Sequence, residues 1–174
     1  MLHYKQFYKI TNETEIHHNF QYKDGLNTLN EEFDEKNKKC GFNFTDKENI
    51  INFVWWGTNI REVFLPLEDK NFKYVQDGIK YRANMIIFGK KYDIFSPDVQ
   101  INIFGKHPWE IIYNACKYGR LDYCIWWHAN CPNIKDILYM NNPFNILSNF
   151  GEHNIFMHEL ISVTSANGHI NILE

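Results

Sequence analysis

The sequence predicts an α+β protein, in which a small N-terminal mixed α/β module precedes antiparallel helix pairs. Before Gly105, short β-prone and alternating segments are separated by turn signals such as Asp24-Gly25. After it, apolar residues recur at helical spacing instead. We therefore predict two domains, an α+β module over residues 1–105 and a helical part over residues 106–174.

Four strands are predicted in the N-terminal module. The β-prone run Phe7–Thr11 forms the first, and alternating apolar and polar residues over 20–23 and 41–44 form the next two. Residues 60–65 form the fourth. Pro66 ends that strand because proline cannot donate a hydrogen bond to a neighbouring strand.

One helix and one loop are predicted among these strands. Thr45 and Glu48 have the spacing of a capping box, so we expect a helix that begins there and ends at Gly57. The charged residues 30–40 predict a surface loop. Residues 81–89 fit either a strand or a helix, since periodicity alone does not decide between them.

Two segments of the helical part read almost as copies of one another, residues 115–124 and residues 164–173. In each, two small residues precede a glycine, Gly119 or Gly168, and spaced apolar residues follow it. Small residues let helices approach closely, and glycine tolerates the left-handed conformation that ends a helix. The pattern predicts ankyrin-like helix pairs, one complete and one that stops at Glu174, and such repeats bind partners.

Several segments resemble one known family, the ankyrin-repeat paralogues of Mimivirus-like giant DNA viruses. The segments that carry the resemblance are residues 7–12, 20–27, 41–46, 60–66, 115–127 and 165–174. The resemblance implies protein–protein interaction and carries over no catalytic residue. It also implies action in the cytoplasm of an infected host, on host or viral proteins.

Four residues of the helical part are the candidate partner-binding residues. Tyr118 and Arg120 flank Gly119, and His169 follows the glycine of the second copy. Trp126 belongs to a Trp pair on one helix, so one of the two side chains has to face outward, where Trp is a common interface hot spot. A ring nitrogen of His169 can also tie neighbouring turns together, which favours a structural role for that residue.

Two further pairs are weighed as sites. Trp55-Trp56 can form an exposed clamp for a planar base or a methylated cap, but the end of a helix favours one Trp packing into the core. His17-His18 can ligate a metal or act as acid and base, although adjacent histidines are more often solvated polar residues.

The net charge argues against one class of partner. At −3, with a pI near 6.2, it gives no electrostatic reason to expect nucleic acid.

The cysteines give no sign of a metal site. The four cysteines form no CxxC pair, and Cys124, His128 and Cys131 match no familiar zinc spacing. This cysteine usage favours an intracellular, reducing setting. We find no signal peptide, and no apolar run approaches the roughly 20 residues that a membrane span needs. No cofactor and no metal site is assigned.

The order of the elements also permits an enzymatic alternative. A first strand, residues 41–45 opening a helix and a strand that ends at Pro66 resemble the layout of ADP-ribosyltransferase-like folds, which bind a nicotinamide nucleotide. Phe44 lacks the hydroxyl of their pattern, residues 9–11 contain no His, and no late catalytic Glu can be assigned. The sequence therefore predicts a non-enzymatic interaction protein. A nucleotide-binding domain without activity is the alternative.

Overall fold

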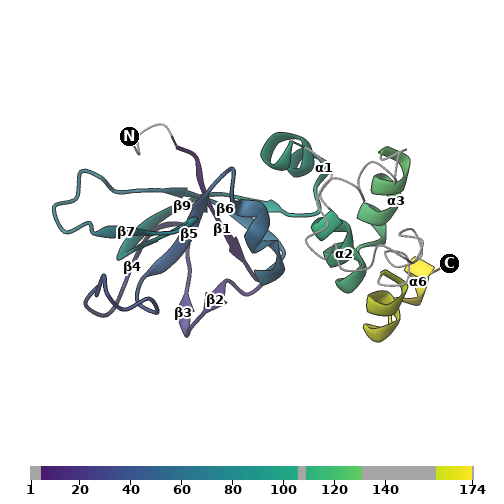
Figure 1. Ribbon diagram of the computed structural model, residues 1–174, viewed down its shortest axis with the longest axis horizontal. Coiled ribbons are helices and arrows are strands. Elements are labelled where there is room, and N and C mark those ends of the chain that lie inside the picture. Colours follow the sequence, from purple (N-terminus) through teal and green to yellow (C-terminus); the bar gives the residue numbers. More distant parts are fainter. Residues whose placement is uncertain (1–4, 106–108, 131–159, 174) are drawn as a thin grey trace, which may run out of the picture. The chain divides into compact units, whose positions relative to one another are not determined.

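The computed structural model describes residues 5–105, 109–130 and 160–173. The chain packs as two units, Met1–Ile94 and Phe95–Glu174, and each is described by itself (Figure 1). The helices that begin at Pro97 belong to the second unit, so this division precedes the boundary predicted near Gly105. The predicted domain limits stay a prediction.

The first unit is built mainly from strands. In chain order its described strands are β1 (Phe7–Thr11), β2 (Ile16–His17), β3 (Phe20–Gln21), β4 (Gly25–Thr28), β5 (Phe42–Asp46), β6 (Asn59–Phe64), β7 (Tyr74–Asp77), β8 (Lys80–Ala83) and β9 (Met85–Asp93). Seven of them form one antiparallel sheet in the order β4-β9-β6-β1-β5-β8-β7, while β2 pairs with β3 (Figure 1). The α+β class is confirmed. The N-terminal unit is richer in sheet than the predicted mixed α/β module.

Strands β1, β3, β5 and β6 coincide with the four predicted strands, and the undecided residues 81–89 lie in β8 and β9. The alternation of side chains places aromatic residues of neighbouring strands on one face, where they form the core. Phe7 meets the ring of Phe44 edge-on at 5.3 Å, and Phe44 stacks on Tyr81 at 5.5 Å. Phe44 thus packs in the core, at the position where the enzymatic alternative would need a group that cradles a nucleotide.

The helix between β5 and β6 is a 3-10 helix, η2 (Ile50–Trp56), and the predicted capping box is wrong. Thr45 belongs to β5, and its hydroxyl donates to a backbone carbonyl of the turn between β7 and β8. The residue before η2, Asn49, makes no capping hydrogen bond through its side chain. The helix packs against β1 with Val54 buried, and it ends at Gly57 as predicted.

Residues 30–40 form a loop, as predicted, but a buried cation anchors it. Arg82 of β8 lies under the loop and donates to the carbonyl oxygens of Glu35 at 2.8 Å and of Asn37 and Cys40 at 2.7 Å. Phe33 from the same loop is buried, with the guanidinium of Arg82 6.0 Å from its ring. The loop is therefore part of the packed structure of the first unit.

The second unit is helical in its described residues. Its elements are α1 (Pro97–Val99), the π-helical turn η3 (Gln100–Phe104), α2 (Trp109–Lys117), α3 (Leu121–Asn130), the helical residues 160–166 and α6 (Ile170–Leu173). Ile111, Ile112 and Ala115 of α2 are buried. Helices thus stand on both sides of Gly119 and of Gly168, while their assignment as ankyrin-like pairs stays a prediction. None of the described helices is long and apolar enough to cross a membrane.

Candidate functional site

Both copies of the repeated segment form the same turn. Gly119 and Gly168 take left-handed φ angles of 70° and 73°, which glycine adopts without strain. In the first turn the N–H of Arg120 donates to the carbonyl of Ala115 at 2.9 Å, and in the second the N–H of His169 donates to that of Thr164 at 3.0 Å. This six-to-one bond is the signature of a Schellman motif. The sequence similarity therefore corresponds to one shared helix ending.

His169 connects the two turns. Its Nε2 lies 3.0 Å from the carbonyl oxygen of Lys117, which is in the last turn of α2. The imidazole also covers Gly119, where an added Cβ would lie 2.6 Å from Nδ1. His169 is thus engaged inside the unit, in agreement with the structural role favoured for it.

Small side chains separate the helices that meet at this point. Ala115, Cys116 and Thr164 are all buried. The thiol of Cys124 on α3 shares a hydrogen bond with the thiol of Cys116, which lowers the pKa of Cys116 to about 7. The pKa of Cys124 is raised by the same contact and by burial. Cys131, the third member of the cysteine and histidine cluster considered above, lies outside the described residues.

Phe95 brings Tyr118 and Arg120 together. The Arg120 guanidinium lies 4.8 Å from the buried Phe95 ring, and the Tyr118 ring lies 6.3 Å from it. Arg120 also holds Asp122 with two hydrogen bonds, from Nε at 3.0 Å and from Nη2 at 2.8 Å, and this lowers the pKa of Asp122. Both predicted residues are fixed in place while Tyr118 stays exposed.

Trp126 lies further along α3. Its ring is 5.5 Å from that of Tyr123, and Tyr123 is itself 5.8 Å from Phe95. Trp127 is buried, so Trp126 is the more exposed member of the Trp pair, and the neighbouring Ile125 is 62% exposed. Phe95 was not predicted as a site residue. It precedes the helical pattern, so no periodicity points to it.

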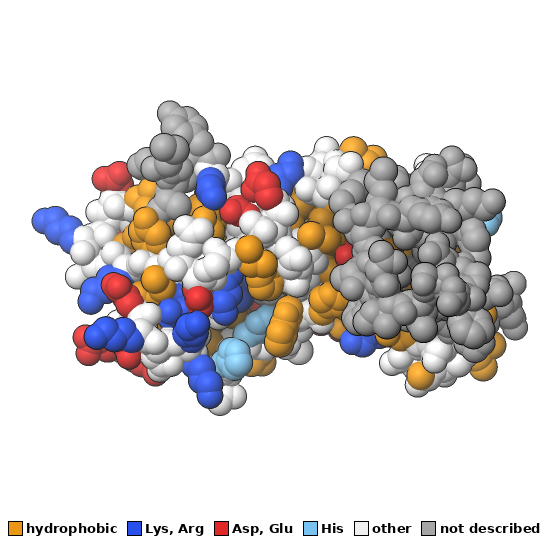
Figure 2. Space-filling model, in the orientation of Figure 1, with side chains coloured by type: hydrophobic (Ala, Val, Ile, Leu, Met, Phe, Trp, Pro, Cys, Tyr) orange, Lys and Arg blue, Asp and Glu red, His pale blue; other side chains and the backbone are white. Residues whose placement is uncertain are grey.

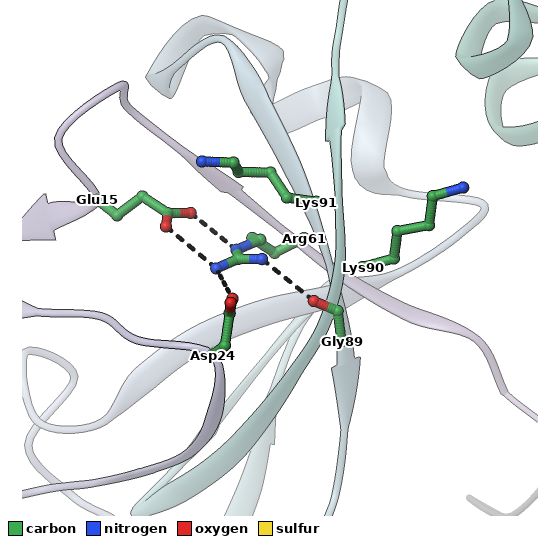
Figure 3. Close-up of a pocket in the computed structure, with 6 residues that line it drawn as sticks. All are labelled: Glu15, Asp24, Arg61, Gly89, Lys90 and Lys91. Atoms are coloured by element: carbon green, nitrogen blue, oxygen red, sulfur yellow. Dashed lines mark hydrogen bonds and ion pairs between the residues drawn. The ribbon is translucent and has the colours of Figure 1, made fainter.

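The first unit contains a polar cavity of about 390 Å³ (Figure 3). It is lined by Glu15, Asp24, Arg61, Gly89, Lys90 and Lys91. Arg61 is buried and donates to Glu15 from Nε at 2.8 Å and from Nη2 at 3.1 Å. Its Nη2 also donates to Asp24, and its Nη1 donates to the carbonyl of Gly89 at 3.1 Å. The guanidinium therefore forms the base of the cavity.

Sequence patterns alone did not single out this cavity. The signal that could have found it is a charged residue at an inward-facing strand position, because Lys9 and Arg61 occupy such positions in β1 and β6. Lys9 is buried and donates to the carbonyl of Asn43 at 2.8 Å, and burial lowers its pKa to about 8. The acidic partners of Arg61 come from segments between strands, which the strand pattern does not describe.

The structure also shows the surroundings of the two other candidate pairs, Trp55-Trp56 and His17-His18. Trp55 and Trp56 are 39% and 71% exposed, so the expectation that one packs into the core is wrong. Val54 faces the sheet, and the next two side chains of η2 turn outward. His17 accepts a hydrogen bond from the N–H of Asn12 at 3.3 Å, and burial, with the charges of Lys9 and His18, lowers its pKa to about 4.

Within the described residues, no three His, Cys, Asp or Glu side chains come together as a metal site. Basic and acidic side chains are intermingled over the visible face of the first unit, which shows no extended basic patch (Figure 2). The described residues place Tyr118 and Arg120 beside the first turn of the second unit and form a polar cavity in the first unit.

Comparison with known proteins identifies relatives in one virus. A protein of Acanthamoeba polyphaga mimivirus whose name assigns it ankyrin repeats is 42% identical over 96 residues, which cover 52% of this chain and 48% of the relative. A second mimivirus protein with an ankyrin repeat name is 30% identical over an alignment of 202 residues, covering 97% of this chain and 44% of the relative. A third, whose name gives no function, is 46% identical over 93 residues, covering 51% of this chain and 67% of the relative.

The chain thus spans about half the length of the two relatives with ankyrin repeat names. No family model matches it, and no solved structure matches it.

Proposed function

Because this chain belongs to the ankyrin-repeat paralogue family of mimivirus, we propose that it acts as a non-enzymatic protein-interaction protein. Its partner is a host or viral protein, and the helical second unit makes the contact. We place this activity in the cytoplasm of the infected host. Ankyrin repeats named in the relatives are binding modules, since such arrays present surface side chains on stacked helix pairs.

One observation supports the proposal: the two copied turns are joined through His169, and side chains beside the first turn keep part of their surface exposed. Tyr118 is exposed, and Arg120 and Trp126 are only partly covered. Aromatic and arginine side chains held on a rigid base are the residues that most often dominate binding energy. We propose Tyr118, Arg120 and Trp126 as the contact residues and His169 as the residue that fixes their turn.

A capture experiment tests this assignment. The full chain, immobilised, is exposed to a lysate of infected Acanthamoeba, and bound proteins are identified and then titrated as purified components. The variant with Tyr118→Ala, Arg120→Ala and Trp126→Ala is expected to lose the partner. A matched variant with Trp55→Ala and Trp56→Ala, which also removes exposed aromatic surface, is expected to keep it.

Two outcomes would contradict the proposal. The first is loss of the partner in the Trp55 and Trp56 variant but not in the triple variant. The second is a rise in melting temperature with NAD, because a ligand that binds the folded state raises stability by mass action. Circular dichroism of each variant establishes that it is folded before binding is compared.

A further inference from the structure

Three cationic side chains stand in one row across the middle of the sheet. Lys9 of β1 lies directly opposite Arg61 of β6, and Arg61 lies directly opposite Lys91 of β9. Directly opposite residues share one face of a sheet, and like charges in such pairs destabilise it. Anionic groups beside the row are therefore needed to offset the repulsion between its three positive charges.

The protein supplies two carboxylates to this row, and they differ in burial. Glu15 is buried and holds Arg61 through both of its oxygens. The side chain of Asp24 is 85% exposed, yet its carboxylate also accepts a hydrogen bond from Arg61. Three positive charges against two negative charges leave an excess of one positive charge. Asp24 is the carboxylate that can leave, because only Glu15 is enclosed by protein.

The cavity above this row is polar on all sides. Its lining consists of charged side chains and one glycine. Figure 3 shows Lys91 extending over Arg61 on the side where Glu15 and Asp24 lie, whereas Lys90 points to the other side of β9. Lys90 instead lies 4.7 Å from the ring of Tyr92. Such a lining suits a small hydrophilic anion, and its volume of about 390 Å³ exceeds that of a single carboxylate group.

We propose that this cavity binds the phosphate-monoester group of a small molecule, which displaces Asp24 from Arg61 and is held by Arg61 and Lys91. When Asp24 swings out, Lys9, Arg61 and Lys91 face Glu15 alone, and the local excess becomes two positive charges. A phosphate monoester carries a charge of about −1.5 to −2 at pH 7 and therefore matches this excess. Asp24 marks the position, since an anionic oxygen already accepts from Arg61 there.

Titration calorimetry on the full chain tests the site, with adenosine monophosphate and inorganic phosphate as the probes and adenosine as the uncharged control. Asp24→Asn is expected to tighten phosphate binding severalfold, because it removes the group that occupies the site in the free protein. Lys91→Gln is expected to weaken binding roughly three- to fivefold, the effect of losing one exposed ion pair. Lys73→Gln is the matched control, since it makes the same charge change at an exposed lysine outside the cavity lining, and it is expected to leave the affinity unchanged.

Several results would overturn the assignment. Equal weakening by Lys73→Gln and Lys91→Gln would mean general attraction by surface charge, which salt also screens. Unchanged affinity in Asp24→Asn would mean that the ligand does not use Arg61. If adenosine bound as tightly as adenosine monophosphate, the cavity would not recognise the phosphate group. Binding of a glutamate-rich peptide through Lys91, without binding of either phosphate probe, would assign the site to protein carboxylates. None of these results bears on the partner surface of the second unit.

Discussion

The two units hold their arginines in opposite environments. In the sheet unit the arginines Arg61 and Arg82 are buried and surrounded by acceptors from the protein itself. In the helical unit Arg120 is partly exposed and pairs with Asp122, two residues along the chain. The difference teaches where binding is to be sought. The sheet unit encloses both of its arginines, with Arg61 at the base of a cavity, whereas the helical unit keeps Arg120 partly exposed.

The sharpest way to break this contrast is to remove one arginine from each unit. Arg82→Met leaves three carbonyl oxygens of the 30–40 loop without their donor, so we expect the free energy of unfolding to fall by about 3 kcal/mol. Arg120→Met removes an exposed ion pair and is expected to cost about 1 kcal/mol or less. Urea unfolding of both variants makes the measurement. Equal losses of unfolding free energy in the two variants would mean that the buried Arg82 contributes no more to stability than the partly exposed Arg120.

A second comparison stays within the helical unit and tests the joined turns. Gly119→Ala and Gly168→Ala both force alanine into a left-handed conformation, at about 1–2 kcal/mol each. Only at Gly119 does the new Cβ also meet the His169 ring, whereas nothing lies within 4 Å at Gly168. Gly119→Ala should therefore have the lower melting temperature of the two.

The control for this pair is His169→Ala in the Gly119→Ala background. It removes the ring that the new Cβ would meet, so the melting temperature is expected to recover toward that of His169→Ala alone. Identical melting temperatures for the two alanine variants would show that His169 does not lie over Gly119.

The third prediction concerns pH and the sheet unit. The pKa of His17 is near 6.5 in the unfolded chain and about 4 in the folded protein, so the unfolded state binds the extra proton between these values. Stability is therefore expected to fall as the pH drops from about 6.5 to about 4, where protonation also competes with the hydrogen bond from Asn12. The urea midpoint, measured across this range, reports the loss.

His17→Asn is expected to flatten the fall in that acid range. His18→Asn is the adjacent control, and it should keep most of the fall. A pH profile that is the same in the wild-type chain and in His17→Asn would contradict this assignment.

The smallest expected effect lies at the thiol pair of the helical unit. Cys124→Ala removes the thiol that shares a hydrogen bond with Cys116, so the pKa of Cys116 is expected to rise from about 7 toward its ordinary range. Ultraviolet absorbance of the thiolate, followed as a function of pH, measures this change. Cys40→Ala removes a buried thiol of the sheet unit and should leave the low titration in place. An unchanged titration in Cys124→Ala would mean that Cys124 does not lower the pKa of Cys116.

Local sequence patterns predicted many elements of each unit. They missed features that depend on contacts between residues far apart in the sequence. A β-prone run located β1, alternation located β3 and β5, and the strand stopped by Pro66 located β6. The copied glycine pattern located both left-handed turns. Thr45 was misplaced because its spacing to Glu48 fits a helix cap as well as it fits the end of a strand. Local spacing does not show that Thr45 pairs with Tyr8 and Lys80 in the sheet, which keeps it in a strand.

The same limit applies to the sites. Tyr118, Arg120 and His169 were selected by their distance from a glycine, and the structure adds that Phe95 supports the first two. Their role in partner binding stays a proposal. The cavity could not be assembled from patterns, because Glu15 and Asp24 reach Arg61 across 46 and 37 residues of chain.

The place of β1 in the sheet has a consequence for synthesis on the ribosome. This strand is made before the other strands of the sheet, yet it lies between β5 and β6, which end at Asp46 and Phe64. Until both have emerged, the apolar side chains of β1 have no partners on either edge, and β9 closes the sheet only at Asp93. Pairings of such long sequence separation form slowly. The nascent sheet unit therefore completes its core only after Asp93 has been translated.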